Sequence, residues 1–146
     1  MIQNPILPGF HPDPCICRKG DDYYLAVSTF EWFPGIPVYH SKDLKHWELL
    51  THVLTDDEKV DLKKLPSAKG IWAPCLTYCE AEDMFYVVYG VMNSMNARYF
   101  DVDNYLICAR DIEGPLSLIH ISCRGLYGWY CAVEPAAFFE KTKVVS

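Results

Sequence analysis

The stretch Asp21-Asp-Tyr-Tyr-Leu-Ala-Val27 recurs further along the chain as Glu82-Asp-Met-Phe-Tyr-Val-Val88. Each copy is an acidic turn followed by a run of aromatic and apolar residues, which is the pattern of a β-strand. A related segment follows each copy, His40-Ser-Lys-Asp-Leu44 in one case and Cys108-Ala-Arg-Asp-Ile112 in the other. The offset of roughly 60 to 70 residues suits a four-stranded sheet with loops, and radial repetition of such sheets builds a β-propeller. Acidic turns before aromatic strands also occur in other β proteins, so the repeat alone leaves the architecture open.

The remainder of the chain also favours strands over helices. No stretch of about 12 residues or more carries a clean helical stripe of apolar side chains. Ten prolines and eight glycines supply turns. Strands are expected over 23–29, 38–41, 47–50, 73–78, 84–90 and 105–110, with a charged loop over 55–69. These features predict an all-β protein.

Composition excludes several classes of function. Of the 146 residues, 51% are apolar and 22% are charged, and the net charge is −6 with no basic cluster. Nucleic-acid binding is therefore not expected, and no apolar run approaches the ~20 residues of a membrane-spanning helix. The seven cysteines cannot all pair within one chain, and the first residues lack the pattern of a signal peptide. We therefore expect reduced thiols and a cytoplasmic location.

The segment Asn4-Pro-Ile-Leu-Pro-Gly-Phe-His-Pro-Asp-Pro14 leads to a single carboxylate, that of Asp13. Pro12 and Pro14 remove two backbone donors near it, and Pro14 holds Asp13 out of the α region. An aspartate fixed in this way suits a general base that aims at a water molecule. Asp-Pro is also common in ordinary turns, so both interpretations remain open on this segment alone.

Aromatic residues gather in Ser28-Thr-Phe-Glu-Trp-Phe-Pro-Gly35, and a further tryptophan lies in Lys69-Gly-Ile-Trp-Ala-Pro-Cys75. Three aromatic residues within four positions before a Pro-Gly turn are unusual for an exposed loop. They indicate either a platform of the kind that grips sugar rings or an aromatic corner of the core.

Taken together, these segments resemble glycoside hydrolase family 43, and its β-xylosidase-like members most closely. The shared motifs stand in the family's order over residues 1–115 and also include Gly20-Asp-Asp-Tyr-Tyr24, His40-Ser-Lys-Asp-Leu44 with Trp47, and Asp111-Ile-Glu-Gly-Pro115. The resemblance implies a five-bladed β-propeller and an inverting glycosidase that removes xylose or arabinose from non-reducing ends of xylo-oligosaccharides. A closed propeller of this size would need on the order of 300 residues, so the chain is expected to hold about the first two blades.

The resemblance also implies roles for individual residues. Asp13 matches the general base of the family. Phe30 and Trp72 match the aromatic residues that wall the subsite of the terminal sugar, and Trp32 and Phe33 are expected at the mouth of that pocket.

No cofactor and no metal are expected in this part of the protein. Some family members hold a calcium ion in the channel, but the residue usually assigned to it lies beyond this chain. The spacings Cys15-x-Cys17 and Cys75-x-x-x-Cys79 match no common zinc pattern.

After residue 115 the chain leaves the family's pattern. The family's second aspartate and its general acid are expected here, but no Gly-Phe-Asp segment is present, and Glu134 and Glu140 stand in unrelated contexts. Leu116-Ser-Leu-Ile-His-Ile121 is what the transposon end used in sequencing libraries would encode, so residues 116–146 are expected to be adapter-derived or frameshifted. The chain by itself is expected to be inactive. The alternative is a non-catalytic carbohydrate-binding module that uses Trp32, Phe33 and Trp72 as its platform.

Overall fold

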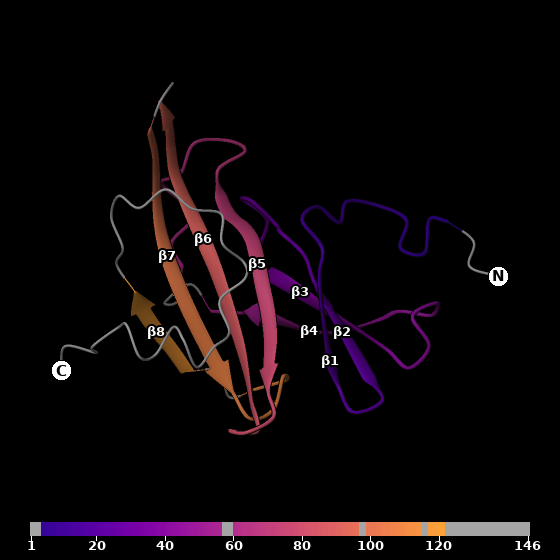
Figure 1. Ribbon diagram of the computed structural model, residues 1–146. Helices are drawn as coiled ribbons and strands as arrows, with labels where there is room; N and C mark the ends of the chain where they lie inside the picture. Colours follow the sequence, from indigo (N-terminus) through magenta and orange to yellow (C-terminus); the bar gives the residue numbers. More distant parts are fainter. Residues whose placement is uncertain (1–3, 57–59, 97–98, 115–116, 122–146) are drawn as a thin grey trace.

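A computed structural model describes residues 4–56, 60–96, 99–114 and 117–121, and this part of the chain is all-β. It consists of two antiparallel sheets with four strands each, in the orders β1-β2-β3-β4 and β5-β6-β7-β8 (Figure 1). The strands are β1 (Cys15–Lys19), β2 (Asp22–Ala26), β3 (Gly35–Ser41), β4 (Glu48–Leu54), β5 (Gly70–Cys79), β6 (Met84–Asn96), β7 (Tyr99–Ala109) and β8 (Ser117–Ile121). In the described ranges no helix is long and apolar enough to cross a membrane.

The internal repeat corresponds to the two sheets. Its acidic turns precede β2 and β6, which are the second strands of their sheets, and its basic-Asp segments end β3 and β7. The aspartates of these two segments accept equivalent hydrogen bonds from the backbone. Asp43 Oδ1 accepts a hydrogen bond from the N–H of Lys45 at 2.9 Å, and Asp111 Oδ1 accepts one from the N–H of Glu113 at 3.0 Å. The repeat therefore encodes the turn chemistry that ends the third strand of each sheet.

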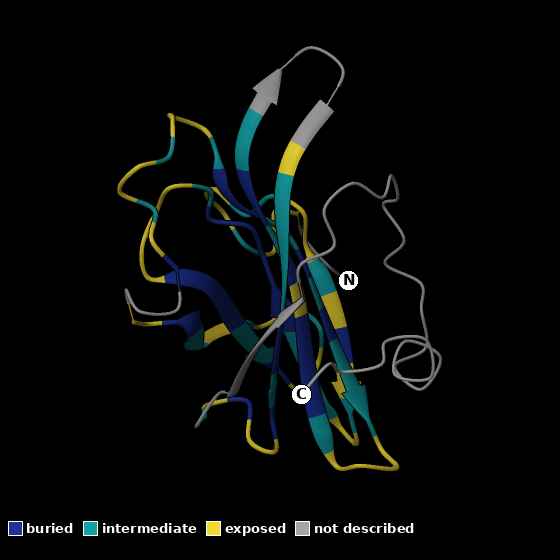
Figure 2. Ribbon diagram, turned by 90° about the vertical axis from the view of Figure 1, so that its left-hand side faces the viewer, coloured by how far each residue is buried: buried dark blue, intermediate teal, exposed yellow. Residues whose placement is uncertain are grey.

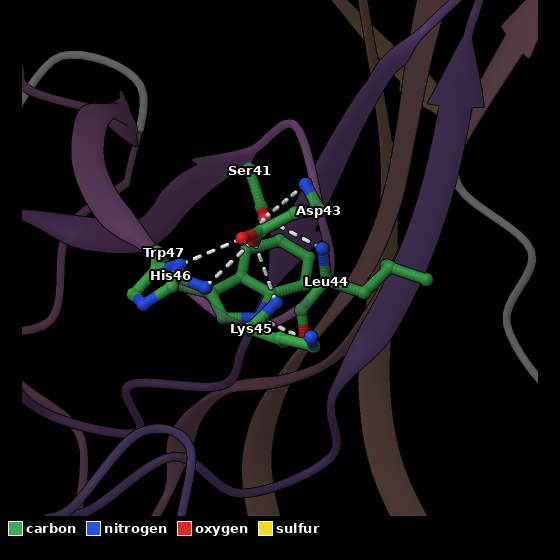
Figure 3. A network of polar contacts seen from close by, with 6 residues as sticks. All are labelled: Ser41, Asp43, Leu44, Lys45, His46 and Trp47. Carbon is green, nitrogen blue, oxygen red and sulfur yellow. Dashed lines mark hydrogen bonds and ion pairs between the residues drawn. The ribbon is translucent and has the colours of Figure 1, made fainter. Parts of the chain in front are cut away.

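The turn between β3 and β4 is a dense polar network (Figure 3). Besides its bond with Lys45, Asp43 Oδ1 accepts from the N–H of His46 at 2.9 Å, and Asp43 Oδ2 lies 2.6 Å from the Nδ1 of His46. The Ser41 Oγ accepts from the N–H of Leu44 at 2.9 Å and donates to Asp43 Oδ1 at 3.2 Å. These bonds satisfy the backbone donors of a tight turn, and they hold the pKa of Asp43 far below its usual range.

The hydrophobic core lies between the two sheets. Alternate side chains of a strand point to opposite faces, and the inner-facing ones of both sheets form one cluster that includes Ala26, Val38, Leu76, Val87 and Ile107. Each of these five side chains is at most 2% exposed. Figure 2 shows buried residues along the strands and exposed residues in the turns at their ends.

Two sets of polar contacts also join the sheets. The Cys15 thiol accepts a hydrogen bond from the N–H of Leu76 at 3.3 Å and lies 3.6 Å from its carbonyl oxygen, which links β1 to β5. At the far end of β1, Lys19 Nζ lies 2.9 Å from Asp83 Oδ1 and 4.5 Å from the centre of the Tyr78 ring. The first strands of the two sheets are therefore held together at both ends.

All six expected strand segments lie in or overlap observed strands, with two differences. β2 ends at Ala26, before the expected end at residue 29, because the N–H of Ser28 turns away from the sheet to donate to the carbonyl oxygen of Pro12. β1 was not expected, since its sequence Cys-Ile-Cys-Arg-Lys is short and poor in strand-forming residues.

The segment expected to be foreign begins within the second sheet. Ser117–Ile121 forms β8 and pairs with β7, with Asn104 opposite Ile121. Residues 122–146, with Glu134, Glu140 and the cysteines of the tail, lie outside the described residues. The boundary at residue 115 and the origin of the tail stay predictions.

Candidate functional site

Three segments meet at one end of the sheet pair. They are residues 4–14 before β1, residues 27–34 between β2 and β3, and the beginning of β5. The second and third segments are joined by a two-bond bridge, in which Phe30 and Ile71 each donate an N–H to the other's carbonyl oxygen at 3.0 Å. The turns β1–β2 and β3–β4 lie at the opposite end because the strands alternate in direction. The three segments for which the sequence predicts a catalytic or sugar-binding role therefore converge on one end of the sheet pair.

Asp13 presents an exposed carboxylate at this end. Its Oδ2 accepts a hydrogen bond from the Ser28 hydroxyl at 2.7 Å, and no residue in the described part of the chain donates to its Oδ1. The backbone of Asp13 avoids the right-handed α region, as expected, but it is left-handed with a φ of 51° and not extended. One carboxylate oxygen is thus tied down, and the other is available to a water molecule.

Ser28 was not singled out from the sequence as a site residue, although it holds Asp13. Its side chain is buried, and its Oγ accepts a hydrogen bond from the N–H of Ala73 at 2.7 Å. The available signal was a serine directly after the apolar strand run Leu25-Ala-Val27, where a buried hydroxyl needs partners. Ser28 therefore connects Asp13 to the beginning of β5.

The aromatic side chains form a connected series. The Phe30 and Trp72 rings meet edge to face with centres 5.6 Å apart, and the Phe10 ring lies 5.7 Å from that of Phe30. Phe10 also contacts Trp32, with ring centres 4.8 Å apart. Trp32 is 58% exposed and Phe10 is 52% exposed, whereas Phe30 and Trp72 are half-buried. The series therefore runs from the half-buried pair of Phe30 and Trp72 to the exposed pair of Phe10 and Trp32.

The membership of the aromatic series differs from the expected pocket at two residues, Phe10 and Phe33. Phe10 belongs to the aromatic series although no role was assigned to it from the sequence. Phe33 makes no ring contact with the series within the described residues, and it lines a separate hollow of about 220 Å³ with Glu31 and residues 60–63. Phe33 is 43% exposed, and its role at the mouth of the pocket stays a prediction.

Three of the seven non-glycine residues with a positive φ in the described ranges lie at the site. Asp13, Phe30 and Ala73 have φ values of 51°, 54° and 44°, which non-glycine residues rarely adopt. Gly70 is also left-handed, with a φ of 103°, and a Cβ there would lie 2.3 Å from the carbonyl oxygen of Phe30. Such conformations persist only where surrounding contacts over-determine them, and they cluster at functional sites. Here those contacts are the Ser28 hydrogen bonds and the bridge between Phe30 and Ile71.

No disulfide joins the five cysteines that the structure describes, and burial raises the pKa of the Cys17 thiol to about 11, so that thiol stays protonated near neutral pH. Within the described ranges, no group of three or more His, Cys, Asp and Glu side chains could hold a metal ion. The expectation that no metal binds here stays a prediction.

Three comparisons with known proteins, by family pattern, by sequence and by structure, find the same class of glycoside hydrolase. The family described as "Glycosyl hydrolases family 43" matches residues 2–125. The β-xylosidase of Bacillus subtilis (strain 168) is 47% identical over 116 residues, which are 80% of this chain and 21% of that protein. A non-reducing end α-L-arabinofuranosidase of Bacteroides ovatus is 48% identical over 107 residues, 70% of this chain and 20% of that protein. The crystal structure of xylan β-1,4-xylosidase from Bacillus halodurans C-125 superposes with a TM-score of 0.80 at 50% identity, covering 86% of this chain and 24% of that one.

The two sheets thus correspond to part of a five-bladed β-propeller, with each sheet as one blade. The chain belongs to glycosyl hydrolase family 43. It spans about a fifth of the length of the curated relatives it matches.

Proposed function

We propose that this chain carries the general-base side of the active site of an inverting glycosidase that removes xylose from the non-reducing ends of xylo-oligosaccharides. One observation carries the proposal. The exposed carboxylate of Asp13 is held by Ser28 next to the segment that bears Trp72, and Trp72 in turn contacts Phe30. A fixed carboxylate beside aromatic rings is the arrangement that a base acting on a bound sugar requires.

In this proposal Asp13 acts on water. The oxygen of a water molecule attacks the anomeric carbon, the glycosidic C–O bond breaks, and Asp13 Oδ1 takes the proton that the water loses. The leaving oxygen needs a proton from a second carboxyl group, which in inverting glycosidases lies roughly 6.5 to 9.5 Å from the base. That group is expected in a part of the propeller that the matched motifs of this chain do not include.

The aromatic residues bind the sugar in the proposed site. Phe30 and Trp72 wall the subsite of the terminal sugar, because their edge-to-face pair presents apolar surface next to the base. Trp32 lies further out at the mouth together with Phe10. Phe33 does not contact these rings in the described part of the chain, and it lines a neighbouring hollow with residues 60–63.

Arabinose is the second candidate for the sugar that is released. The 48% identity with an α-L-arabinofuranosidase is as high as the 47% identity with a β-xylosidase, so the described residues favour neither. Parallel assays with an aryl β-xyloside and an aryl α-L-arabinofuranoside separate the two.

A chimaera tests the proposed activity. Residues 4–114 replace the aligned segment of the Bacillus halodurans xylosidase, which supplies the remaining blades. The folded chimaera should release sugar, and Asp13→Asn should lower kcat by about a hundredfold or more because the base is removed. A folded chimaera that releases neither sugar would overturn the proposal.

The 146-residue chain by itself should bind sugar weakly at most and should not turn it over. Acid catalysis is typically worth about 10² to 10⁴-fold, and no residue here is assigned to it. A carbohydrate-binding module is the alternative, and the exposed pair of Phe10 and Trp32 favours it. Xylo-oligosaccharide binding by a stable monomer, abolished by Trp72→Ala, would support the module.

We also propose a cytoplasmic location, since reduced thiols suit a reducing compartment.

A further inference from the structure

Ser28 is the buried residue on which the parts of the site converge. It is 1% exposed and lies between the segment before β1 and the beginning of β5. Its N–H donates to the carbonyl oxygen of Pro12 at 3.0 Å. Its Oγ donates to Asp13 Oδ2 at 2.7 Å and accepts from the N–H of Ala73 at 2.7 Å. A single side chain therefore bonds to residues 15 positions before it and 45 positions after it.

The direction of these hydrogen bonds follows from the partners. A backbone N–H can only donate, so the bond with Ala73 uses a lone pair of the Ser28 hydroxyl. The hydroxyl has one hydrogen, which is then directed at Asp13 Oδ2. The orientation of the Asp13 carboxylate is thus coupled to the position of the Ala73 amide.

Both partners of this hydroxyl have strained backbones. Asp13 and Ala73 are left-handed, with φ values of 51° and 44°, and neither is glycine. Ala73 directly follows Trp72, so the bond that restrains Ala73 also restrains the backbone of the tryptophan. Loss of the hydroxyl would remove a hydrogen bond from two strained residues of the proposed site at once.

We propose that Ser28 is a positioning residue for the hydrolytic reaction. Its hydroxyl holds the Asp13 carboxylate so that Oδ1 faces the attacking water, and it fixes the position of that carboxylate relative to Trp72. The inference rests on the proposed role of Asp13 as general base. Without the Ser28 bond the carboxylate can rotate about its side-chain torsions, and a smaller fraction of molecules places an oxygen where the water loses its proton.

The same sheet contains a matched control. Ser41 is 2% exposed, and its hydroxyl donates to Asp43 Oδ1 and accepts from the N–H of Leu44 (Figure 3). It repeats the chemistry of Ser28 at the opposite end of the sheet, away from Asp13. Ser41→Ala therefore measures what the loss of a buried, bonded serine costs the fold without touching the proposed site.

The experiment compares Ser28→Ala, Ser28→Thr and Ser41→Ala in the chimaera, with kcat, KM and a thermal melt for each. Ser28→Ala should lower kcat by about tenfold to a hundredfold, the size of effect that a misplaced catalytic group produces, with KM changed by less than about threefold. Ser28→Thr keeps the hydroxyl and should recover most of the lost kcat. Ser41→Ala should lower the melting temperature and leave kcat within about twofold of the parent.

Three results would overturn the inference: a Ser28→Ala kcat within about twofold of the parent, an equal fall in Ser41→Ala, or no recovery in Ser28→Thr. Should Ser28→Ala fail to fold, Ser28→Cys keeps the size of the side chain with a weaker donor, and the same fall in kcat is expected. A second host, the Bacillus subtilis β-xylosidase, guards against a chimaera that does not fold. A folded parent chimaera without activity overturns the proposed function itself, which distinguishes that failure from the failure of the Ser28 inference.

Discussion

Lys19 Nζ lies 2.9 Å from Asp83 Oδ1, and this ion pair joins the β1–β2 turn of the first blade to the β5–β6 turn of the second. The Tyr78 hydroxyl donates to the same carboxylate oxygen at 2.7 Å. The Lys19 ammonium also lies over the rings of Tyr78 and Phe85. The contact is at the opposite end of β1 from Asp13, so it can be changed without touching the proposed site.

Lys19→Met should lower the melting temperature of the chimaera slightly, and the difference should shrink at high salt. The aliphatic part of the side chain still covers the two rings, so the change removes mainly the charge. Exposed ion pairs contribute little and are screened within a Debye length of about 3 Å at 1 M salt. Thermal melts at low and high NaCl measure this, with Lys45→Met as a control that removes an exposed charge with no ion pair in the described part of the chain. A difference that persists undiminished at 1 M salt would contradict the charge explanation.

Asp43→Ala should destabilise the chimaera near neutral pH and lose this effect in acid. Hydrogen bonds from the backbone N–H groups of His46 and Lys45 hold the pKa of Asp43 far below the ordinary aspartate value of 3.8. A carboxyl group with a lowered folded-state pKa contributes stability that is present above its unfolded pKa and is lost as the pH falls through the folded pKa. Melting temperatures of parent and variant should therefore differ above about pH 5 and converge as the pH falls well below 3.8.

The control for this prediction is Asp21→Ala, because the Asp21 side chain is 94% exposed and lies 3.7 Å from Arg18. Above about pH 5, it should change the melting temperature far less than Asp43→Ala does. Equal effects of the two variants would show that general charge, and not the turn network, is responsible.

Gly70→Ala should destabilise the protein and lower activity because its backbone and its surroundings both exclude a side chain. A Cβ at Gly70 would lie 2.3 Å from the carbonyl oxygen of Phe30, where backbone atoms cannot move aside easily. We expect a loss of about 2 kcal/mol or more in the free energy of unfolding. Gly20→Ala is the matched control, since Gly20 is also left-handed but has nothing within 4 Å of the added Cβ. Denaturant melts of the two variants in the chimaera give the difference, and equal losses would refute the clash.

The 146-residue chain on its own should self-associate and show no cooperative melt. Ile16 and Leu49 are each 54% exposed and lie on the two edge strands of the first sheet, in line with Tyr39 and the buried Leu25 between them. Exposed apolar side chains on the edge strands of an open sheet favour association. Circular dichroism during heating and sedimentation velocity measure both properties. A stable monomer with a sharp transition would contradict this prediction and favour the binding-module alternative.

Much of the fold could be predicted from the sequence because its signals are local. Acidic turns, aromatic strand runs and aspartates that accept from the next backbone N–H groups act over a few residues, so the repeat of residues 21–27 and 82–88 identifies the second strand of each sheet. β1 could not be predicted in this way. It is a strand because it pairs with β2 and bonds through Cys15 to Leu76, a contact that spans 61 positions.

For the site, the sequence by itself determined which chemical groups are present. These are the carboxylate of Asp13 between two prolines and the aromatic side chains of Phe30, Trp32 and Trp72, all of which lie in motifs of one family. Only the tertiary structure decided which of these groups meet. It brought Ala73 to a serine 45 positions earlier, joined Phe10 to Trp32, and separated Phe33 from the other rings. The physical reason is that a turn or a strand is stabilised by near neighbours, whereas the Asp13 carboxylate is held by Ser28, and the Ser28 hydroxyl accepts the hydrogen bond from Ala73 only after the two blades have packed together.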